Sequence, residues 1–204
     1  MATEILVPFL AAVPRLEGAD LLLFRAHSLI SHAIQTVGES RYNHVGTVAW
    51  VRGPRGELWV PYCIDTMEGR GGDCIPLRHV LKTYPGWIDV YEPNPDGLWT
   101  KYSREGCERW LWENIPKRPY GKQSIWRFAL RHIPGIRWFL RPSQEDGKRM
   151  KGDPVCSSAR AIADRVGGGV DPVPNLADEE VQPGHLARSP FYRYKFTLKR
   201  EKST

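Results

Sequence analysis

The stretch Asp153-Pro154-Val155-Cys156-Ser157-Ser158-Ala159-Arg160 decides how this 204-residue chain is interpreted, because it predicts a helix with a cysteine in its first turn. Asp153 is a residue type that caps helix N-termini, and Pro154 suits the first helical position. The exposed backbone N–H groups and the dipole of a first turn favour a thiolate over a thiol. Cys156 is therefore the candidate nucleophile, although a buried structural cysteine is the commoner role of this residue type.

A second stretch, Tyr42-Asn43-His44-Val45-Gly46-Thr47-Val48-Ala49-Trp50, puts a histidine at the head of a predicted strand. An imidazole on a strand that faces the helix is the base that a cysteine nucleophile needs. His44 shares a face with Gly46, which leaves room beside the ring for a partner side chain. A hydrogen-bonded strand-end histidine is the alternative. The order is unusual, because papain-like enzymes carry the cysteine before the histidine.

A third group should orient the imidazole and favour one tautomer. Two carboxylates follow the predicted hairpin partner of the histidine strand, in Ile64-Asp65-Thr66-Met67-Glu68-Gly69. Glu68, beside a glycine-rich loop, is the first choice, and Asp65 is the reserve. Either could instead be a solvated loop carboxylate.

Composition favours one domain over residues 1–204, since 41% of the residues are hydrophobic and 25% are charged. The apolar run at 5–13 is too short to cross a bilayer and lacks the basic leader of a signal peptide. We therefore expect a soluble protein, with the cytoplasm and a virus particle both open as its location. Cysteines at 63, 74, 107 and 156 form no Cys-x-x-Cys pair, which predicts free thiols, no metal site and no cofactor.

Residues 116–152 predict a basic and aromatic insertion within this domain. Between 117 and 151, ten Lys or Arg residues stand against two acids, while the whole chain has a net charge of +6. Such a stretch suits an anionic lipid surface or cell-wall polymer, and a solvated insertion packed through its aromatics is the alternative. The candidate contacts are Arg127, Arg131, Arg137 and Arg141. No nucleic-acid-binding motif accompanies them, so no specific nucleic acid is expected.

The remaining pattern predicts an α+β fold in which helices pack on an antiparallel sheet. The expected strands are 21–24, 44–51, 57–64, 87–91 and 191–198, and the expected helices are 28–37, 77–83, 98–114 and 154–166. A glycine-rich loop is expected at 69–72.

In their joint order these stretches resemble the circularly permuted NlpC-type, or YiiX-like, papain-fold proteins. The resemblance implies a papain-like core with Cys156 as nucleophile, His44 as base and Glu68 as orienting group. It also implies that Tyr42 and Ser157 lie near the oxyanion or substrate. The segments that carry it are Gly18 to Phe24, Tyr42 to Gly46, the acidic residue before the glycine loop, Val155 to Ser157 and Val181 to Pro190.

The leading hypothesis is a cysteine peptidase or amidase that cleaves peptide or cell-wall (peptidoglycan) amide bonds through a thioester. A lipid-directed acyl hydrolase or acyltransferase on the same residues is the second hypothesis. The third is a binding or assembly module, for example of a virus particle, in which Cys156 is inert. The sequence leaves the exact substrate and the oligomeric state open.

Overall fold

A seven-stranded sheet runs through the computed structural model, which describes residues 4–26, 40–52, 59–67, 70–117 and 156–200. The strands lie in the order β1-β7-β6-β2-β3-β4-β5. Neighbours are antiparallel except β1 and β7, which are parallel, so the sheet is mixed rather than antiparallel throughout. The strands are β1 Leu6–Val7, β2 Leu21–Arg25, β3 His44–Arg52, β4 Trp59–Met67, β5 Gly71–Pro76, β6 Trp87–Pro93 and β7 Tyr192–Leu198.

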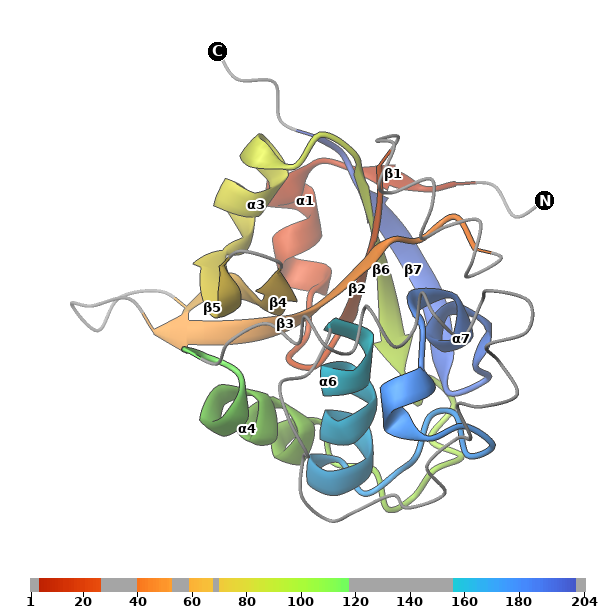
Figure 1. Cartoon of the computed structure of the whole chain (residues 1–204). Coiled ribbons are helices and arrows are strands. Elements are labelled where there is room, and N and C mark those ends of the chain that lie inside the picture. The colour runs from red at the N-terminus through yellow and green to blue at the C-terminus, as the bar shows by residue number, and fades with distance from the viewer. Residues whose placement is uncertain (1–3, 27–39, 53–58, 68–69, 118–155, 201–204) are drawn as a thin grey trace, which may run out of the picture.

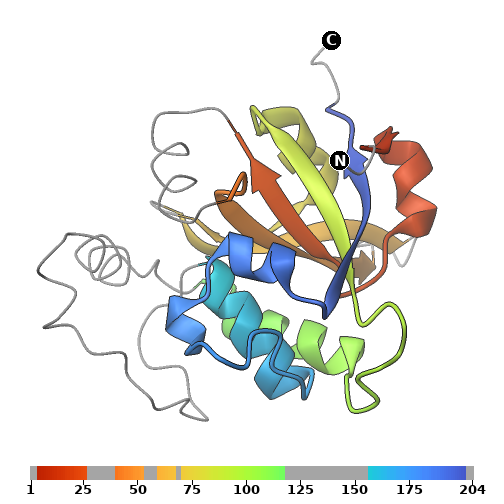
Figure 2. The same ribbon diagram turned by 90° about the vertical axis from the view of Figure 1, so that its right-hand side faces the viewer.

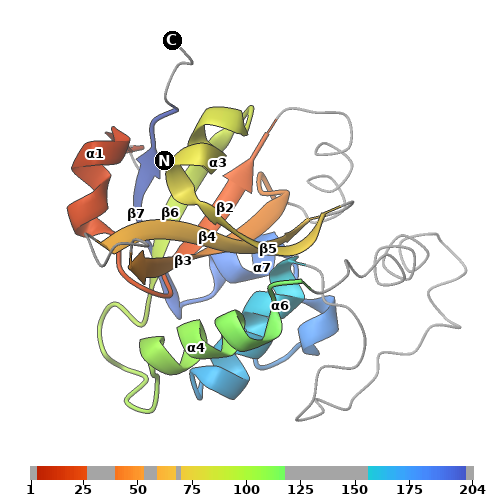
Figure 3. The same ribbon diagram turned by 90° about the vertical axis from the view of Figure 1, so that its left-hand side faces the viewer.

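Helices cover both faces of this sheet (Figure 1). On one face lie α1 (Phe9–Ala12) and α3 (Leu77–Thr83). On the other lie α4 (Arg104–Asn114), α6 (Cys156–Ile162) and α7 (Pro183–Arg188), as Figures 2 and 3 show from two sides. This arrangement is the α+β class that the sequence predicts.

Strand β3 lies between the two helical layers and has apolar side chains on both of its faces. Val48 packs in the cluster that contains residues of α1 and α3, whereas Ala49 packs with residues of α4 and α6. Because successive side chains of a strand point to opposite faces, a strand covered on both sides has apolar residues at nearly every position. The run of small and β-branched residues that predicted this strand therefore reflects burial on both sides.

One strand extends further than the sequence predicts, and another was not expected from it. β4 continues through Asp65 and Thr66 to Met67, and β5 begins at Gly71, inside the predicted glycine-rich loop. Gly72 is needed for close packing rather than for a loop, since a Cβ there would lie 1.9 Å from the backbone oxygen of Ile115. The continuous ladder between β4 and β5 makes Asp65 a strand residue.

The helices also differ from their predicted bounds. α4 begins at Arg104 rather than at residue 98, because the Ser103 hydroxyl caps it by accepting a hydrogen bond from the N–H of Gly106 at 2.9 Å. α6 is described from Cys156 onward and passes into a π-helical turn over Ala163–Gly167. The predicted helix at 28–37, the cap at Asp153 and nearly all of the 116–152 insertion lie outside the described residues.

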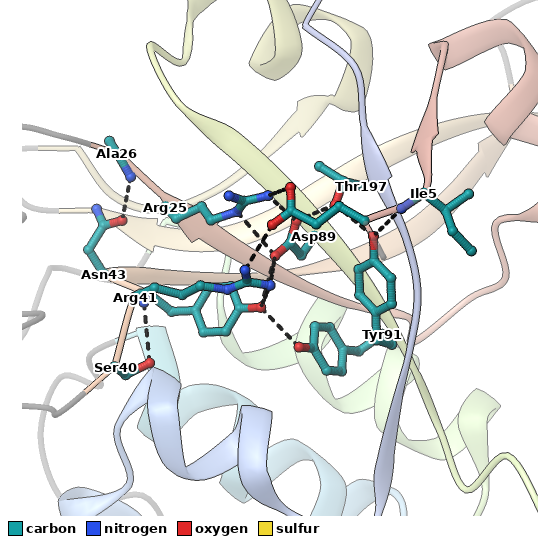
Figure 4. Close-up of polar contacts among 12 residues, drawn as sticks. Ile5, Arg25, Ala26, Ser40, Arg41, Asn43, Asp89, Tyr91 and Thr197 are labelled. Carbon is teal, nitrogen blue, oxygen red and sulfur yellow. Dashed lines mark hydrogen bonds and ion pairs between the residues drawn. The ribbon is translucent and has the colours of Figure 1, made fainter. Parts of the chain in front are cut away.

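Asp89 of β6 links several segments through one buried carboxylate (Figure 4). It accepts hydrogen bonds from Arg25 of β2 at 3.2 Å, from Thr197 of β7 at 2.6 Å, and from Arg41 and Tyr42 at 2.9 and 2.8 Å. A buried charge is costly unless it is paired and hydrogen-bonded. This Asp89 cluster therefore holds the segment that leads into β3 against the sheet.

We expect Asp89→Asn to lower the free energy of unfolding by about 3 kcal/mol, since it removes one member of a buried ion pair. Glu4 is the matched control, because it pairs with Arg25 and Arg41 from a side chain that is 40% exposed. Glu4→Gln should cost less than about 1 kcal/mol. Urea unfolding of the two variants measures both values, and equal losses would contradict the structural role given to Asp89.

Candidate functional site

The start of β3 meets the described beginning of α6, and this junction brings His44 and Cys156 together. Cys156 lies close enough to His44 to raise the pKa of the imidazole. His44 is 8% exposed, and Cys156 is partly exposed at the first described position of its helix. A thiol beside a base is the arrangement that activates a cysteine nucleophile.

Asp65 holds the other side of the imidazole. Its Oδ2 atom lies 3.1 Å from Nε2 of His44, and both residues are buried. Asp65 stands opposite Gly46 in the β3–β4 ladder, so it shares a face of the sheet with His44, which lies two positions along β3. Because Asp65 engages Nε2, the nitrogen left to exchange a proton with Cys156 is Nδ1.

Phe24 packs against the same imidazole. The two rings meet edge to face with their centroids 4.9 Å apart, because Phe24 is the residue opposite His44 on β2. A Cβ at position 46 would lie 2.6 Å from the Cys63 sulfur and 3.2 Å from the Phe24 ring. The space that the sequence analysis assigned to a partner of the imidazole is therefore filled by Cys63 and Phe24.

Arg70 completes the surroundings of Asp65 and was not singled out from the sequence. Its Nη2 donates to Oδ1 of Asp65 at 2.7 Å, while its Nε lies 3.4 Å from Asp73. One carboxylate oxygen of Asp65 thus faces Arg70 and the other faces His44. The signal for this residue was its place inside the glycine-rich stretch, two residues after Glu68 and five after Asp65.

Several groups act on the charge of His44. Burial disfavours the imidazolium, but the attraction of Cys156 and the hydrogen bonds to Asp65 and Cys156 outweigh it and raise the pKa of His44 to about 10. The ring is then positively charged at neutral pH.

The hydroxyl groups of two other predicted residues are engaged away from the imidazole. The Tyr42 hydroxyl donates to Asp89 and accepts from Arg41, which leaves it without a second proton for an oxyanion. The Ser157 hydroxyl is buried and donates to the backbone oxygen of Val181 at 2.6 Å, so it fastens α6 to the segment before α7. Glu68 and the arginines Arg127, Arg131, Arg137 and Arg141 lie outside the described residues.

Comparison with known proteins identifies a similar fold. No family model and no curated protein matches this chain. The crystal structure of the metalloprotein YiiX from Escherichia coli O157:H7 matches with a TM-score of 0.58 and 16% sequence identity, over 92% of this chain and 98% of YiiX. Within the described ranges, no helix has the length and apolar character to cross a bilayer.

YiiX is described as a metalloprotein, so the fit of a metal ion to the residues of this site matters. The ranges that the structure describes contain no group of three or more His, Cys, Asp or Glu side chains that could hold one. Asp65, the carboxylate nearest the site, already binds His44 and Arg70 through its two oxygens. These residues do not fit a metal, and the four cysteines are free thiols.

We expect Asp65→Asn to lower the pKa of His44 from about 10 toward its ordinary value. The sign follows from charge, since a carboxylate stabilises the imidazolium and a neutral amide does not. An NMR titration of the imidazole Cε1–H measures the midpoint. His185, whose pKa is lowered by burial and by Arg188, is the internal reference and should titrate unchanged. An unchanged midpoint for His44 would contradict the role of Asp65.

Proposed function

We propose that this chain is a cysteine hydrolase of amide bonds, built on a circularly permuted papain-like fold of the NlpC type. The observation that carries the proposal is the line Cys156–His44–Asp65, in which the thiol lies beside the imidazole and the imidazole is hydrogen-bonded to the carboxylate. The similarity to the fold of YiiX supports the architecture. Peptides, including cell-wall peptides, are the proposed substrates.

In the first half of the reaction, the Cys156 sulfur attacks the substrate carbonyl carbon and the carbonyl π electrons move to oxygen. Backbone N–H groups in the first turn of α6 stabilise the resulting oxyanion. His44 then gives its Nδ1 proton to the leaving amine as the C–N bond breaks, which leaves a thioester on Cys156.

In the second half, His44 takes a proton from water, and the hydroxide attacks the thioester carbon. Collapse of this intermediate releases the carboxylic acid product and returns the sulfur as a thiolate beside the imidazolium. Asp65 keeps the second ring proton on Nε2 and stabilises the positive charge whenever His44 is protonated.

Within this proposal Asp65, the reserve candidate, takes the orienting role that the resemblance implied for Glu68. Asp65 is a β4 residue on the same face of the sheet as His44 and lies in contact with its imidazole. The base precedes the nucleophile along the chain. This order does not affect the chemistry, because a triad is defined by the geometry and roles of its side chains.

We expect Cys156→Ala to lower the hydrolysis of peptide and peptidoglycan-fragment substrates by at least about a thousandfold, since the nucleophile is lost. Cys74→Ala is the matched control, because Cys74 is also a partly exposed free thiol and should leave the rate unchanged. Intact mass spectrometry follows the thioester adduct on the wild type. Full hydrolysis by Cys156→Ala would refute the proposal, and an adduct formed with phospholipid alone would favour the lipid-directed hypothesis.

We expect Asp65→Asn to lower kcat by about a hundredfold or more, because the imidazole loses its orienting carboxylate. Glu68→Gln, which removes the competing carboxylate, should stay within about twofold of the wild type under the same principle. Steady-state kinetics on one peptide substrate compares the two. The opposite ranking would return the role to Glu68.

A further inference from the structure

A buried arginine lies one turn after the cysteine on α6. Arg160 is four residues beyond Cys156, which places both side chains on one side of the helix. Arg160 is 1% exposed, and it lines the same small cavity as Cys156, between α6, β3 and β4. An arginine in this position needs partners for its N–H groups, because a buried charge without them is strongly destabilising.

One side of the guanidinium is fixed by Asp164, one further turn along the chain. Nε and Nη2 of Arg160 donate to the two oxygens of Asp164 at 2.8 and 3.0 Å. Asp164 is itself fully buried and also accepts from Tyr102, Cys107 and Tyr192. A planar guanidinium held at two nitrogens has a single orientation, so the direction of its third nitrogen is set.

That third nitrogen reaches the strand that carries the base. Nη1 of Arg160 donates to the Thr47 hydroxyl at 3.1 Å, and Thr47 lies on β3 three residues after His44. The bond joins two buried side chains and connects the helix of the thiol directly to the strand of the imidazole. Arg160 also contacts Tyr192 of β7 through Nε at 3.2 Å, but this contact does not involve β3.

The contact between Cys156 and His44 is sensitive to the position of α6 along β3. Side chains of α6 pack with Val45 and Ala49, whereas His44 lies on the opposite face of β3 beside Phe24. The thiol and the imidazole therefore meet at the end of the strand and not through a packed face. The apolar contacts of α6 resist separation from the sheet more than sliding along it, because the hydrophobic effect is non-directional.

We propose that Arg160 is a positioning residue, whose hydrogen bond to Thr47 sets the register of α6 on β3 and thereby the contact between Cys156 and His44. The proposal rests on the cysteine-hydrolase function proposed above. The bond is directional, so it supplies the restraint on sliding that apolar packing lacks. Asp164 holds the guanidinium through two of its nitrogens, and Thr47 accepts a hydrogen bond from the third.

The test uses Thr47→Val, which keeps the shape of the side chain and removes the acceptor. Thr47→Ser keeps the hydroxyl and is the rescuing variant. Tyr192→Phe is the matched control, because it deletes another buried hydroxyl bonded to Arg160 and Asp164 without touching β3. Thermal unfolding of each variant establishes that it is folded. Thr47→Ala, which leaves room for water beside the guanidinium, gives the same test if Thr47→Val does not fold.

The readout is the rate at which iodoacetamide alkylates Cys156 from about pH 5 to about pH 9, assigned by peptide mass spectrometry. Burial and the neighbouring Asp73 raise the pKa of Cys74 to about 12, so Cys74 reacts slowly across this range. Cys63 and Cys107 are buried. In the wild type we expect fast alkylation of Cys156 below pH ~7, as for a thiolate paired with an imidazolium.

We expect Thr47→Val to slow the alkylation of Cys156 below neutral pH by about tenfold or more, since small displacements of reacting groups have effects of this size. Thr47→Ser and Tyr192→Phe should keep the profile of the wild type. An unchanged profile in folded Thr47→Val, or an equal loss in Tyr192→Phe, would overturn the positioning role. A wild-type Cys156 without fast alkylation below pH ~7 would instead refute the proposed function itself.

Discussion

The register between β3 and β4 is the constraint on which the candidate site depends. It sets Asp65 opposite Gly46, and the alternation of side chains then puts the carboxylate on the face of His44. A slip of one residue would turn Asp65 to the other face and remove the hydrogen bond to Nε2. Continuous burial on both sides of β3 makes such a slip costly, so the core that stabilises the sheet also fixes the geometry of the imidazole.

Charged side chains in the interior connect the layers around this register. The Asp89 cluster joins β2, β6 and β7 to the segment before β3, while Arg160 and Asp164 join α6 to β3 and β7. Each buried charge has an oppositely charged partner and further hydrogen bonds, which is the condition under which such groups are tolerated. Their hydrogen bonds are directional, so they specify the positions of helices and strands more precisely than apolar contacts alone.

Part of this arrangement could be predicted from local sequence. The strands near 44–51 and 191–198 and the helix at 77–83 match the structure within a few residues, because periodicity and turn residues act over short distances. The predicted end of β4 and the predicted start of α4 were wrong, because contacts that the local pattern does not show set these boundaries. Pairing of β4 with β5 extends that strand past Ile64, and the Ser103 cap begins α4 later than its apolar pattern suggests.

The sequence by itself determined the types of residue available for chemistry, namely a cysteine near a helix start, a histidine at a strand start and two carboxylates after a hairpin. These follow from local preferences of the backbone and its capping residues. The tertiary structure alone decided that Asp65 contacts the imidazole, that Tyr42 is committed to Asp89, and that Arg160 reaches Thr47 across 113 positions of the chain. Contacts between distant segments depend on strand register and helix packing, and no local pattern encodes either.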